Sequence, residues 1–317
     1  MSVDGLLVID KPAGPTSHDV VARVRRVLRE RRIGHTGTLD PGATGVLPLV
    51  LGRATRLARF LSARDKQYEA VIRLGTATDT YDAHGVPSGV RHQGAWPSRS
   101  EIEAVLDTFR GTSLQQPPAF SAKKIEGRRS HRLARAARAT SQLDRPELPA
   151  PVPVTAQAID LTSVEDDLVT LTIDCSAGFY VRSLAHDLGD RLGVGAHLTA
   201  LRRTRSGDLT VADALPLDVA ERDRDAARAA VIPLDRMLPS LSAVVLTHAG
   251  ARHVAHGRDL GSADIAQDPP AAASPPCVRL PLAAQQCVRL MTEGGQLLGI
   301  AEPAEAPGLL HPSVVLV

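Results

Sequence analysis

The sequence predicts an α+β protein in which helices flank a mixed central sheet, followed by a small unit built mainly of strands. Apolar runs typical of strands are followed by single helical patterns, without the regular strand–helix–strand rhythm of a parallel α/β sheet. Beyond Pro239, short strand-like runs indicate a second unit, so we divide the chain into residues 1–239 and 240–317. A chain of 317 residues, 43% hydrophobic and 23% charged, has room for two unequal domains.

The elements of the first unit follow from the spacing of its apolar residues. Apolar or alternating runs predict strands over residues 6–9, 46–51, 67–74 and 169–175. Apolar residues at helical spacing predict helices over residues 20–28, 57–61, 100–109 and 181–192. Thr16 or Ser17 can cap the first of these helices. Tyr68 shares the inward face of its strand with Ala70 and Ile72.

The second unit has short strand patterns around one long loop. Residues 264–276 are rich in alanine and proline, a composition typical of a flexible loop. The strand patterns cover residues 277–282, 286–292, 297–301 and 313–317.

One loop carries most of the chemical information in the sequence. Residues 34–45 read Gly-His-Thr-Gly-Thr-Leu-Asp-Pro-Gly-Ala-Thr-Gly, so a single carboxylate, Asp40, stands among four glycines, three threonines and one proline. Glycine permits unusual backbone angles and close approach of another molecule, whereas Pro41 fixes the chain directly after the acid. Turn chemistry alone would explain a short Asp-Pro-Gly turn but not the whole string. The sequence therefore predicts a stiff, exposed loop that presents one acid.

Positive charge is concentrated in one stretch of a chain whose formal net charge is only +2. Between residues 121 and 151, acids are few and basic side chains many. A solvated helix face is the usual meaning of such a run, but its single sign favours contacts with phosphates. The basic residues are Lys123, Lys124, Arg128, Arg129, Arg132, Arg135, Arg138 and Arg145.

Several classes of site are disfavoured by composition. The three cysteines lack metal-ligand spacing, their odd number argues against a disulfide framework, and Cys175 is expected to be a small core residue. Glycine-rich phosphate loops are absent and the histidines are scattered, so we expect neither a cofactor nor a metal. No apolar run approaches membrane-spanning length and no signal peptide is recognisable, so we expect a cytoplasmic protein without membrane contact. A lone acid such as Asp40 can act as a covalent nucleophile, whereas a glycosidase needs two carboxylates.

Several blocks of sequence resemble the TruB family of tRNA pseudouridine synthases, in family order. They span about the first two thirds of the chain. The resemblance implies a pseudouridine synthase fold and an isomerase that converts the uridine at position 55, in the TΨC loop of tRNA, without a cofactor. Besides residues 34–45, the blocks are 5–17 (Gly-Leu-Leu-Val-Ile-Asp-Lys-Pro-Ala-Gly-Pro-Thr-Ser), 52–56 (Gly-Arg-Ala-Thr-Arg), 66–68 (Lys-Gln-Tyr), 75–82 (Gly-Thr-Ala-Thr-Asp-Thr-Tyr-Asp), 175–182 (Cys-Ser-Ala-Gly-Phe-Tyr-Val-Arg) and 195–203 (Gly-Ala-His-Leu-Thr-Ala-Leu-Arg-Arg).

The resemblance assigns the catalytic residues. Asp40 is the nucleophile, and Tyr68 stacks on the target base and assists proton transfer. Arg182 falls in the first turn of its predicted helix, where the helix dipole disfavours a cation. The resemblance implies that Arg182 pairs with Asp40, whose negative charge would compensate it. An arginine at that distance would keep the acid ionised. From the residues alone, Tyr68 could equally be a core tyrosine and Arg182 could reach solvent.

The resemblance also assigns residues around the target base. A base in a folded tRNA arm must be extruded before it reacts, and His35 fills the space that the flipped nucleotide leaves. Tyr180 and Leu201 form an apolar wall around the uracil, and Lys11 supports the catalytic loop. A hydrogen-bonding structural histidine, a core leucine and a surface lysine are the alternatives. Asp82 is expected to be a turn acid, with substrate contact as its alternative.

RNA contacts are expected mainly in the basic stretch. Family members carry an RNA-gripping insertion where this chain has residues 121–151, although a tyrosine usually stands at the position of His131. Residues 249–257 and 296–301 resemble parts of a small PUA-type RNA-binding β-barrel. The RNA contacts that we expect are Lys123, Lys124, Arg128, Arg129, Arg132, Arg202 and Arg203.

Other functions are compatible with parts of this pattern. A noncatalytic protein that binds or folds tRNA would not need Asp40, Tyr68 and Arg182 together. A pseudouridine synthase directed by a guide RNA is disfavoured by the basic insertion after Phe120, which favours a stand-alone enzyme with no obligatory protein partner. A hydrolase that uses Asp40 is a more distant alternative.

Overall fold

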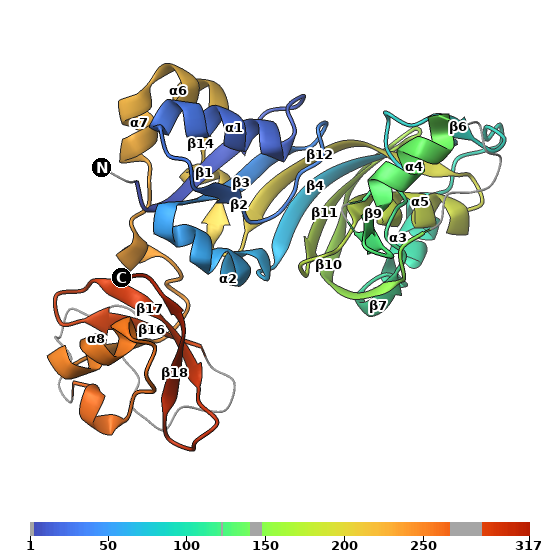
Figure 1. The fold of residues 1–317 in the computed structure, drawn as a ribbon. Helices are drawn as coiled ribbons and strands as arrows, with labels where there is room; N and C mark the ends of the chain where they lie inside the picture. Colours follow the sequence, from blue (N-terminus) through green and yellow to red (C-terminus); the bar gives the residue numbers. More distant parts are fainter. Residues whose placement is uncertain (1–2, 122, 140–147, 267–286) are drawn as a thin grey trace.

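The computed structural model describes residues 3–121, 123–139, 148–266 and 287–317 (Figure 1). The main strands of the first unit are β1 (Gly5–Lys11), β2 (Ile33–His35), β3 (Thr44–Leu51), β4 (Lys66–Leu74), β7 (Gly111–Gln115), β10 (Val152–Glu165), β11 (Leu168–Cys175), β12 (Ala196–Ser206), β13 (Leu209–Thr210) and β14 (Leu215–Pro216). Within the described residues they form one 10-stranded sheet in the order β14-β1-β3-β12-β4-β11-β10-β7, with β2 beside β3 and β13 beside β12. Its neighbouring strands run antiparallel except for β1 with β14 and β3 with β12, so the predicted mixed sheet is confirmed.

Helices cover the sheet at both of its ends. They are α1 (Ser17–Leu28), η1 (Gly52–Leu57), α2 (Ala58–Ser62), α3 (Arg99–Asp107), α5 (Val181–Arg191), α6 (Leu217–Arg222) and α7 (Arg224–Ala229). Figure 1 shows α1 with α6 and α7 at the end that holds β1, and α3 with α5 at the other end. Thr16 caps α1 by accepting a hydrogen bond from the Asp19 amide at 3.0 Å, as its position in the sequence predicts. No helix among the described residues is long and apolar enough to cross a bilayer.

The main core lies between the sheet and these helices. Leu7, Ile72 and Leu171 of the sheet are fully buried in it, and so is Cys175, which confirms that this cysteine is a small core residue. Short hairpins extend from the sheet: β5 (Ala77–Thr78) pairs with β6 (Pro87–Ser88), and β8 (Lys124–Ile125) pairs with β9 (Arg128–Arg129). The second hairpin continues into α4 (Ser130–Ala139), and together they form the described part of the basic insertion.

The second unit has a separate sheet. Its elements are β15 (Ala243–Leu246), α8 (His248–Ala255), β16 (Val288–Thr292), β17 (Leu297–Pro303) and β18 (Leu310–Val315), and the strand order is β15-β16-β17-β18. The strands predicted over residues 286–292, 297–301 and 313–317 correspond to β16, β17 and β18. The strand predicted over residues 277–282 lies outside the described residues.

The two units share a hydrophobic core. Leu297 and Leu316 of the second unit belong to the same buried cluster as Leu6 and Leu57 of the first. Arg53, in η1, donates a hydrogen bond to the carbonyl of Leu316 at 2.8 Å. Side-chain packing and a hydrogen bond therefore join the second unit to the first.

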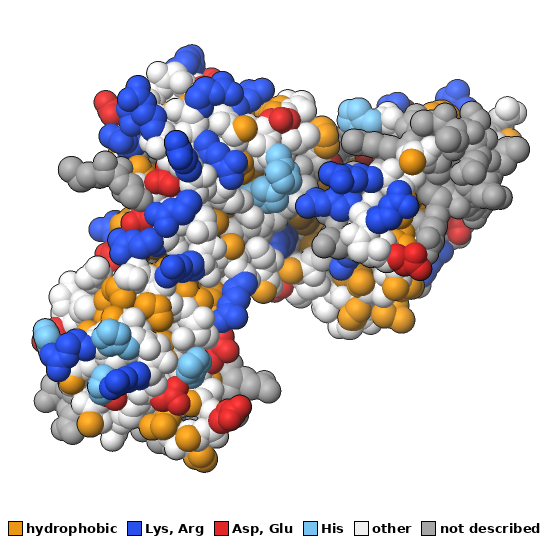
Figure 2. All heavy atoms as spheres, viewed as in Figure 1, with side chains coloured by type: hydrophobic (Ala, Val, Ile, Leu, Met, Phe, Trp, Pro, Cys, Tyr) orange, Lys and Arg blue, Asp and Glu red, His pale blue; other side chains and the backbone are white. Residues whose placement is uncertain are grey.

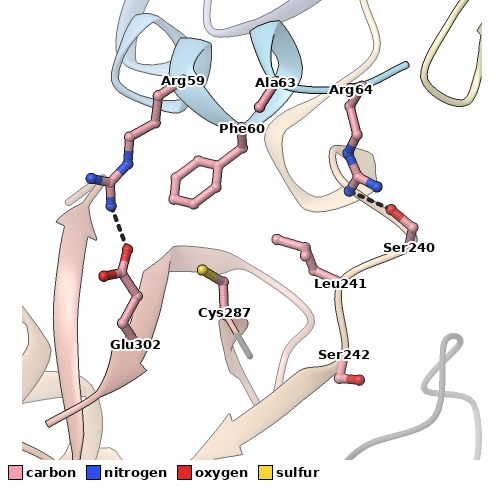
Figure 3. A pocket seen from close by; sticks show the side chains of 9 residues that line it. All are labelled: Arg59, Phe60, Ala63, Arg64, Ser240, Leu241, Ser242, Cys287 and Glu302. Atoms are coloured by element: carbon pink, nitrogen blue, oxygen red, sulfur yellow. Dashed lines mark hydrogen bonds and ion pairs between the residues drawn. The ribbon is translucent and has the colours of Figure 1, made fainter. Parts of the chain in front are cut away.

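A cavity of about 560 Å³ lies where α2 faces the second unit (Figure 3). Arg59 pairs with Glu302 at 2.7 Å on one side of it, and Arg64 donates to the hydroxyl of Ser240 at 2.5 Å on the other. Phe60 points into the space between these pairs. None of the predicted catalytic residues lines this cavity.

Candidate active site

The loop that carries Asp40 joins β2 to β3 and is held mainly by Lys11. This lysine, at the end of β1, is fully buried. Its Nζ donates to the carbonyls of Pro41 at 3.1 Å and Ala43 at 2.7 Å, and to that of Pro12 at 2.9 Å. Burial lowers the pKa of Lys11 to about 8, although the charge of Asp40 acts in the opposite direction. Lys11 thus fixes the backbone on the C-terminal side of the acid.

The start of α1 holds the other side of the same loop. Ser17 donates from its hydroxyl to the carbonyl of Leu39 at 3.0 Å and accepts from the amide of Leu39 at 2.8 Å. The amide of Gly14 donates to the carbonyl of Pro41 at 2.8 Å. The predicted stiff loop therefore has its backbone polar groups fixed on both sides of Asp40. The side chain of Asp40 itself stays 40% exposed.

Arg182 pairs with Asp40, as the resemblance implies. Its Nη2 donates to Oδ1 at 3.3 Å, and its Nε lies 2.9 Å from Oδ2 as an ion pair without hydrogen-bond alignment. The side chain is only 6% exposed and also donates to the carbonyls of Thr80 at 3.0 Å and Phe120 at 2.9 Å. These partners compensate a cation in the first turn of α5, where the helix dipole disfavours it.

Asp82 is a second acid beside Arg182; from the sequence we expected a turn acid, with substrate contact as the alternative. It does order the turn, because its Oδ1 accepts from the hydroxyl of Thr80 at 2.7 Å and from the amide of His84 at 3.0 Å. Its Oδ2 also lies 3.6 Å from Nη1 of Arg182. An acid in a turn segment gives no signal in the sequence for this second contact.

Tyr68, Leu201 and Arg203 lie on one face of the sheet. In the register of β4 with β12, Tyr68 is opposite Arg203 and Ala70 is opposite Leu201. The Tyr68 side chain is 8% exposed, and burial raises the pKa of its hydroxyl, while the nearby Arg203 guanidinium lowers it and Asp40 raises it. The charges of Arg203 and Asp40 therefore both act on the phenol hydroxyl, in opposite directions.

Arg203 does not fit the prediction that it contacts RNA. Its side chain is 1% exposed, and its guanidinium donates to the carbonyls of Val46 at 2.7 Å and Gly37 at 3.1 Å. A buried group that is already used in this way presents no surface to a phosphate. Its neighbour Arg202 faces the other side of the strand, is 35% exposed and pairs with Asp10 at 2.8 Å, so it stays a candidate for RNA contact.

The residues expected around the base occupy three separate elements. Tyr180 occupies the N-cap position of α5 and is half-buried; its amide donates to the side-chain oxygen of Gln115, and its carbonyl accepts from the side-chain nitrogen of Gln115. Burial raises the pKa of Tyr180, and the charges of Arg182 and Asp40 both act on it. Burial lowers the pKa of His35, on β2, to about 4, with the charges of His18 and Arg203 acting in the same direction. His35 is therefore neutral at physiological pH.

The basic insertion begins next to the active site. The carbonyl of Phe120, directly before it, accepts the hydrogen bond from Arg182. Arg128, Arg129 and Arg132 are exposed, and Lys123 is half-buried. The side chains of Lys124 and His131 lie outside the described part of the chain. Figure 2 shows a hollow between the end of the molecule that holds α1 and the end that holds the insertion, with Lys and Arg side chains on both sides of it.

This arrangement provides one nucleophile with its counter-ion and a buried hydroxyl. Asp40 is accessible and Arg182 pairs with it. The charge of Asp40 also raises the pKa of the Tyr68 hydroxyl. Among the residues that the structure describes, no group of His, Cys, Asp and Glu side chains could hold a metal ion. The site is suited to covalent catalysis by a carboxylate with proton transfer through a nearby side chain.

Comparisons with known proteins identify the family. A model of the "TruB family pseudouridylate synthase (N terminal domain)" matches residues 25–181, and one of the "tRNA pseudouridylate synthase B C-terminal domain" matches residues 182–239. The tRNA pseudouridine synthase B of Solibacter usitatus is 41% identical over 99% of this chain and 100% of its own length. The chain belongs to the TruB family. The Geobacter sulfurreducens member of this family is 45% identical over 80% of this chain and 82% of its own.

Solved structures place this TruB-family chain among pseudouridine synthase folds. A crystal structure of a Cbf5–Nop10–Gar1 complex contains a chain that is 26% identical, with a TM-score of 0.70 over 99% of this chain and 85% of that one. An H/ACA RNP bound to a substrate RNA that contains 2'-deoxyuridine gives 25% identity and a TM-score of 0.69, with the same coverage. The sequence blocks that resemble the family therefore led to the correct fold.

Proposed function

We infer that this chain isomerises uridine to pseudouridine in tRNA. Membership of the TruB family and relatives named tRNA pseudouridine synthase B that match the chain over its full length support this inference. The observation that carries it is the ion pair between Asp40, on its fixed loop, and Arg182, on α5, together with the buried Tyr68, whose hydroxyl is subject to the charge of Asp40. This is the set that a noncatalytic tRNA-binding protein would not need.

The reaction needs little besides these groups. The bond between nitrogen 1 and the sugar breaks, the base turns, and a bond forms between the sugar and carbon 5. The proton on carbon 5 is lost and nitrogen 1 gains one, so atoms and electrons balance without an oxidant or a cofactor. Asp40 acts as the nucleophile, Arg182 holds it, and Tyr68 packs on the base and takes part in the proton transfer.

We propose the uridine at position 55, in the TΨC loop, as the target. That uridine must leave its stack to reach Asp40, and His35 fills the resulting gap. A neutral imidazole suits this role, because it replaces a stacked base without adding charge. Leu201 and Tyr180 then line the pocket for the uracil. Lys123, Lys124, Arg128, Arg129, Arg132 and Arg202 are the proposed contacts to the backbone of the TΨC arm.

We further propose that the enzyme needs no obligatory protein partner and acts in the cytoplasm, where its substrate tRNA is found. The matched chain in the Cbf5–Nop10–Gar1 complex belongs to an assembly, so a guide-RNA-directed enzyme is the alternative. The exposed arginines of the insertion favour the stand-alone form, since they offer this chain its own contacts to RNA. The second unit is proposed to be a PUA-type module that adds further RNA contacts.

The test uses the full-length protein and one unmodified tRNA transcript, without any other protein or guide RNA. Mapping pseudouridine after incubation should reveal one site, at position 55. A transcript with cytidine at that position is the matched control and should remain unmodified. Pseudouridine at a different position would overturn the proposed target, and modification only after a guide RNA is added would favour the alternative. Strong tRNA binding with no pseudouridine at all would favour a noncatalytic protein.

A further inference from the structure

Arg203 is a buried cation at the centre of the candidate site. It lies on β12, and its side chain is 1% exposed. Its Nε donates to the carbonyl of Val46 at 2.7 Å, and its Nη2 donates to the carbonyl of Gly37 at 3.1 Å. Gly37 precedes Asp40 along the chain and Val46 follows it. One planar guanidinium therefore holds the backbone on both sides of the acid, which a point charge cannot do with the same geometry.

The backbone of Arg203 touches the same loop. Gly45, the second residue of β3, has a φ of +98°, and a Cβ placed there would lie only 2.2 Å from the carbonyl oxygen of Arg203. Only glycine allows this approach, so the end of the loop closes directly onto β12. The position of Arg203 relative to Asp40 is thus fixed by main chain and side chain together.

The same guanidinium acts on Tyr68. The two residues are directly opposite each other in the register of β4 with β12, so their side chains are neighbours on one face of the sheet. Burial raises the pKa of the Tyr68 hydroxyl, and the charge of Arg203 together with a hydrogen bond from it counteracts that rise. Arg203 also acts on Lys66: burial lowers the pKa of this lysine to about 8, and the charge of Arg203 acts in the same direction.

We propose that Arg203 is a positioning residue for the isomerisation: it holds the Asp40 loop and the Tyr68 hydroxyl in one geometry and stabilises negative charge on the phenol oxygen. The proposal rests on the proposed roles of Asp40 and Tyr68. Tyr68 can accept the proton from carbon 5 only through an ionised oxygen, and it then releases that proton to solvent while nitrogen 1 gains one. A fixed cation beside this oxygen favours the ionised form without any further rearrangement.

The decisive variant is Arg203→Gln in the full-length protein. We expect its single-turnover rate at saturating tRNA to fall by about 100-fold, the size of a typical proton-transfer contribution, with the tRNA dissociation constant unchanged within error. Tyr68 should also ionise at a higher pH than in the wild type. The chain has three tyrosines, so isotope-labelled tyrosine gives a simple NMR spectrum, and Tyr68→Phe identifies the resonance to follow.

Arg205→Gln is the matched control. Arg205 lies on the same strand, but its guanidinium pairs with Asp174 and not with the Asp40 loop. The same change there should leave both the single-turnover rate and the titration of Tyr68 as in the wild type.

A folded Arg203→Gln variant with the wild-type rate, or with unchanged titration of Tyr68, would overturn the proposal. Reduced tRNA affinity with a normal rate at saturation would also overturn it and return Arg203 to the RNA contacts. If Arg203→Gln does not fold, Arg203→Lys decides. Lysine keeps the positive charge but not the planar set of N–H donors of the guanidinium. The pH at which Tyr68 ionises should therefore stay near that of the wild type, while the single-turnover rate falls. A wild-type rate in Arg203→Lys would contradict the proposal. Failure of the proposed function is distinguishable, because the wild type itself would then form no pseudouridine.

Discussion

At the scale of single residues, three buried cations hold the loop that carries Asp40 and its acid. Lys11, Arg182 and Arg203 are 0%, 6% and 1% exposed. A buried charge is costly unless hydrogen bonds and counter-ions satisfy it, and each of these cations donates to backbone carbonyls. The loop is therefore preorganised before a substrate arrives, and its acid does not have to be positioned by the RNA.

We predict that Asp40→Asn abolishes isomerisation while tRNA binding survives. The change keeps the size of the side chain and one acceptor for Arg182, but removes the nucleophilic charge. The single-turnover rate should fall on the order of 10⁴-fold or more, as for other lost nucleophiles. Asp208→Asn, in the exposed turn after β12, removes the same charge and should have no such effect. An Asp40→Asn enzyme with near-normal turnover would exclude Asp40 as the nucleophile.

Lys11 should make stability depend on pH in a defined window. Folding lowers its pKa from 10.5 to about 8, so between these values the unfolded chain holds a proton that the folded chain has released. Lys11 therefore increases the free energy of unfolding as the pH rises from 8 to 10.5. In urea unfolding at pH 8 and pH 10, the wild type should gain stability relative to Lys11→Met, by at most a few kcal/mol. A constant difference between the two proteins would contradict the lowered pKa.

The two neighbouring arginines of β12 mark a limit of prediction from sequence. Strict alternation from the buried Ala196 and Leu198 would turn Arg202 inward and Arg203 outward. A β-bulge between Leu198 and Ala200 shifts the register by one residue, so Leu201 and Arg203 face inward instead. Asp40, in contrast, was predictable because its loop composition has no other simple explanation.

At the scale of elements, the regular strands and helices were predictable and the irregular ones were not. β1, β3, β4 and β11 lie where apolar runs or alternation predict them, and α1 and α5 follow from their helical spacing. β10 was missed because its start is rich in proline, which is typical of loops, and because bulges interrupt its alternation. β12 was missed because bulges interrupt its alternation and because it contains a run of arginines.

The basic insertion is the element whose role is most directly measurable. Arg128 and Arg129 lie on β9 and Arg132 lies on α4, and all three are exposed. Changing the three to glutamate should weaken tRNA binding and lower the slope of log affinity against log salt by about one for each lost phosphate contact. The rate at saturating tRNA should change much less than the affinity.

The matched control reverses three exposed arginines elsewhere, Arg99, Arg222 and Arg228. These lie on α3, α6 and α7, and they change the net charge by the same amount. If both triple variants lower the salt slope equally, the insertion has no special contact with RNA. A slope that stays unchanged in the insertion variant would place the RNA elsewhere on the protein.

At the scale of the whole molecule, the two units are more closely joined than the sequence suggests. Composition and strand patterns indicate a boundary near Pro239, but they carry no information on what covers the outer face of β1 and η1. In the structure, Leu297 and Leu316 cover it and complete a single buried cluster. Arg53 and Arg59 add hydrogen bonds to Leu316 and Glu302 across the same boundary. The second unit is thus part of the support of β1, which ends at Lys11 and so leads to the catalytic loop.

Deleting the chain from Ser240 onward should therefore destabilise the remaining unit rather than only weaken RNA binding. The deletion exposes Leu6 and Leu57, which are 2% and 0% exposed in the full chain, and it removes their apolar partners. We expect residues 1–239 to aggregate or to melt well below the full-length protein in calorimetry. Leu316→Ala in the full chain tests the same contact without a truncation, and loss of this buried side chain should cost about 2–5 kcal/mol. If the units share one core, Leu316→Ala should lower a single cooperative transition. Two separate transitions, with only one of them shifted, would mean that the units fold independently and that the deletion should leave a stable catalytic unit.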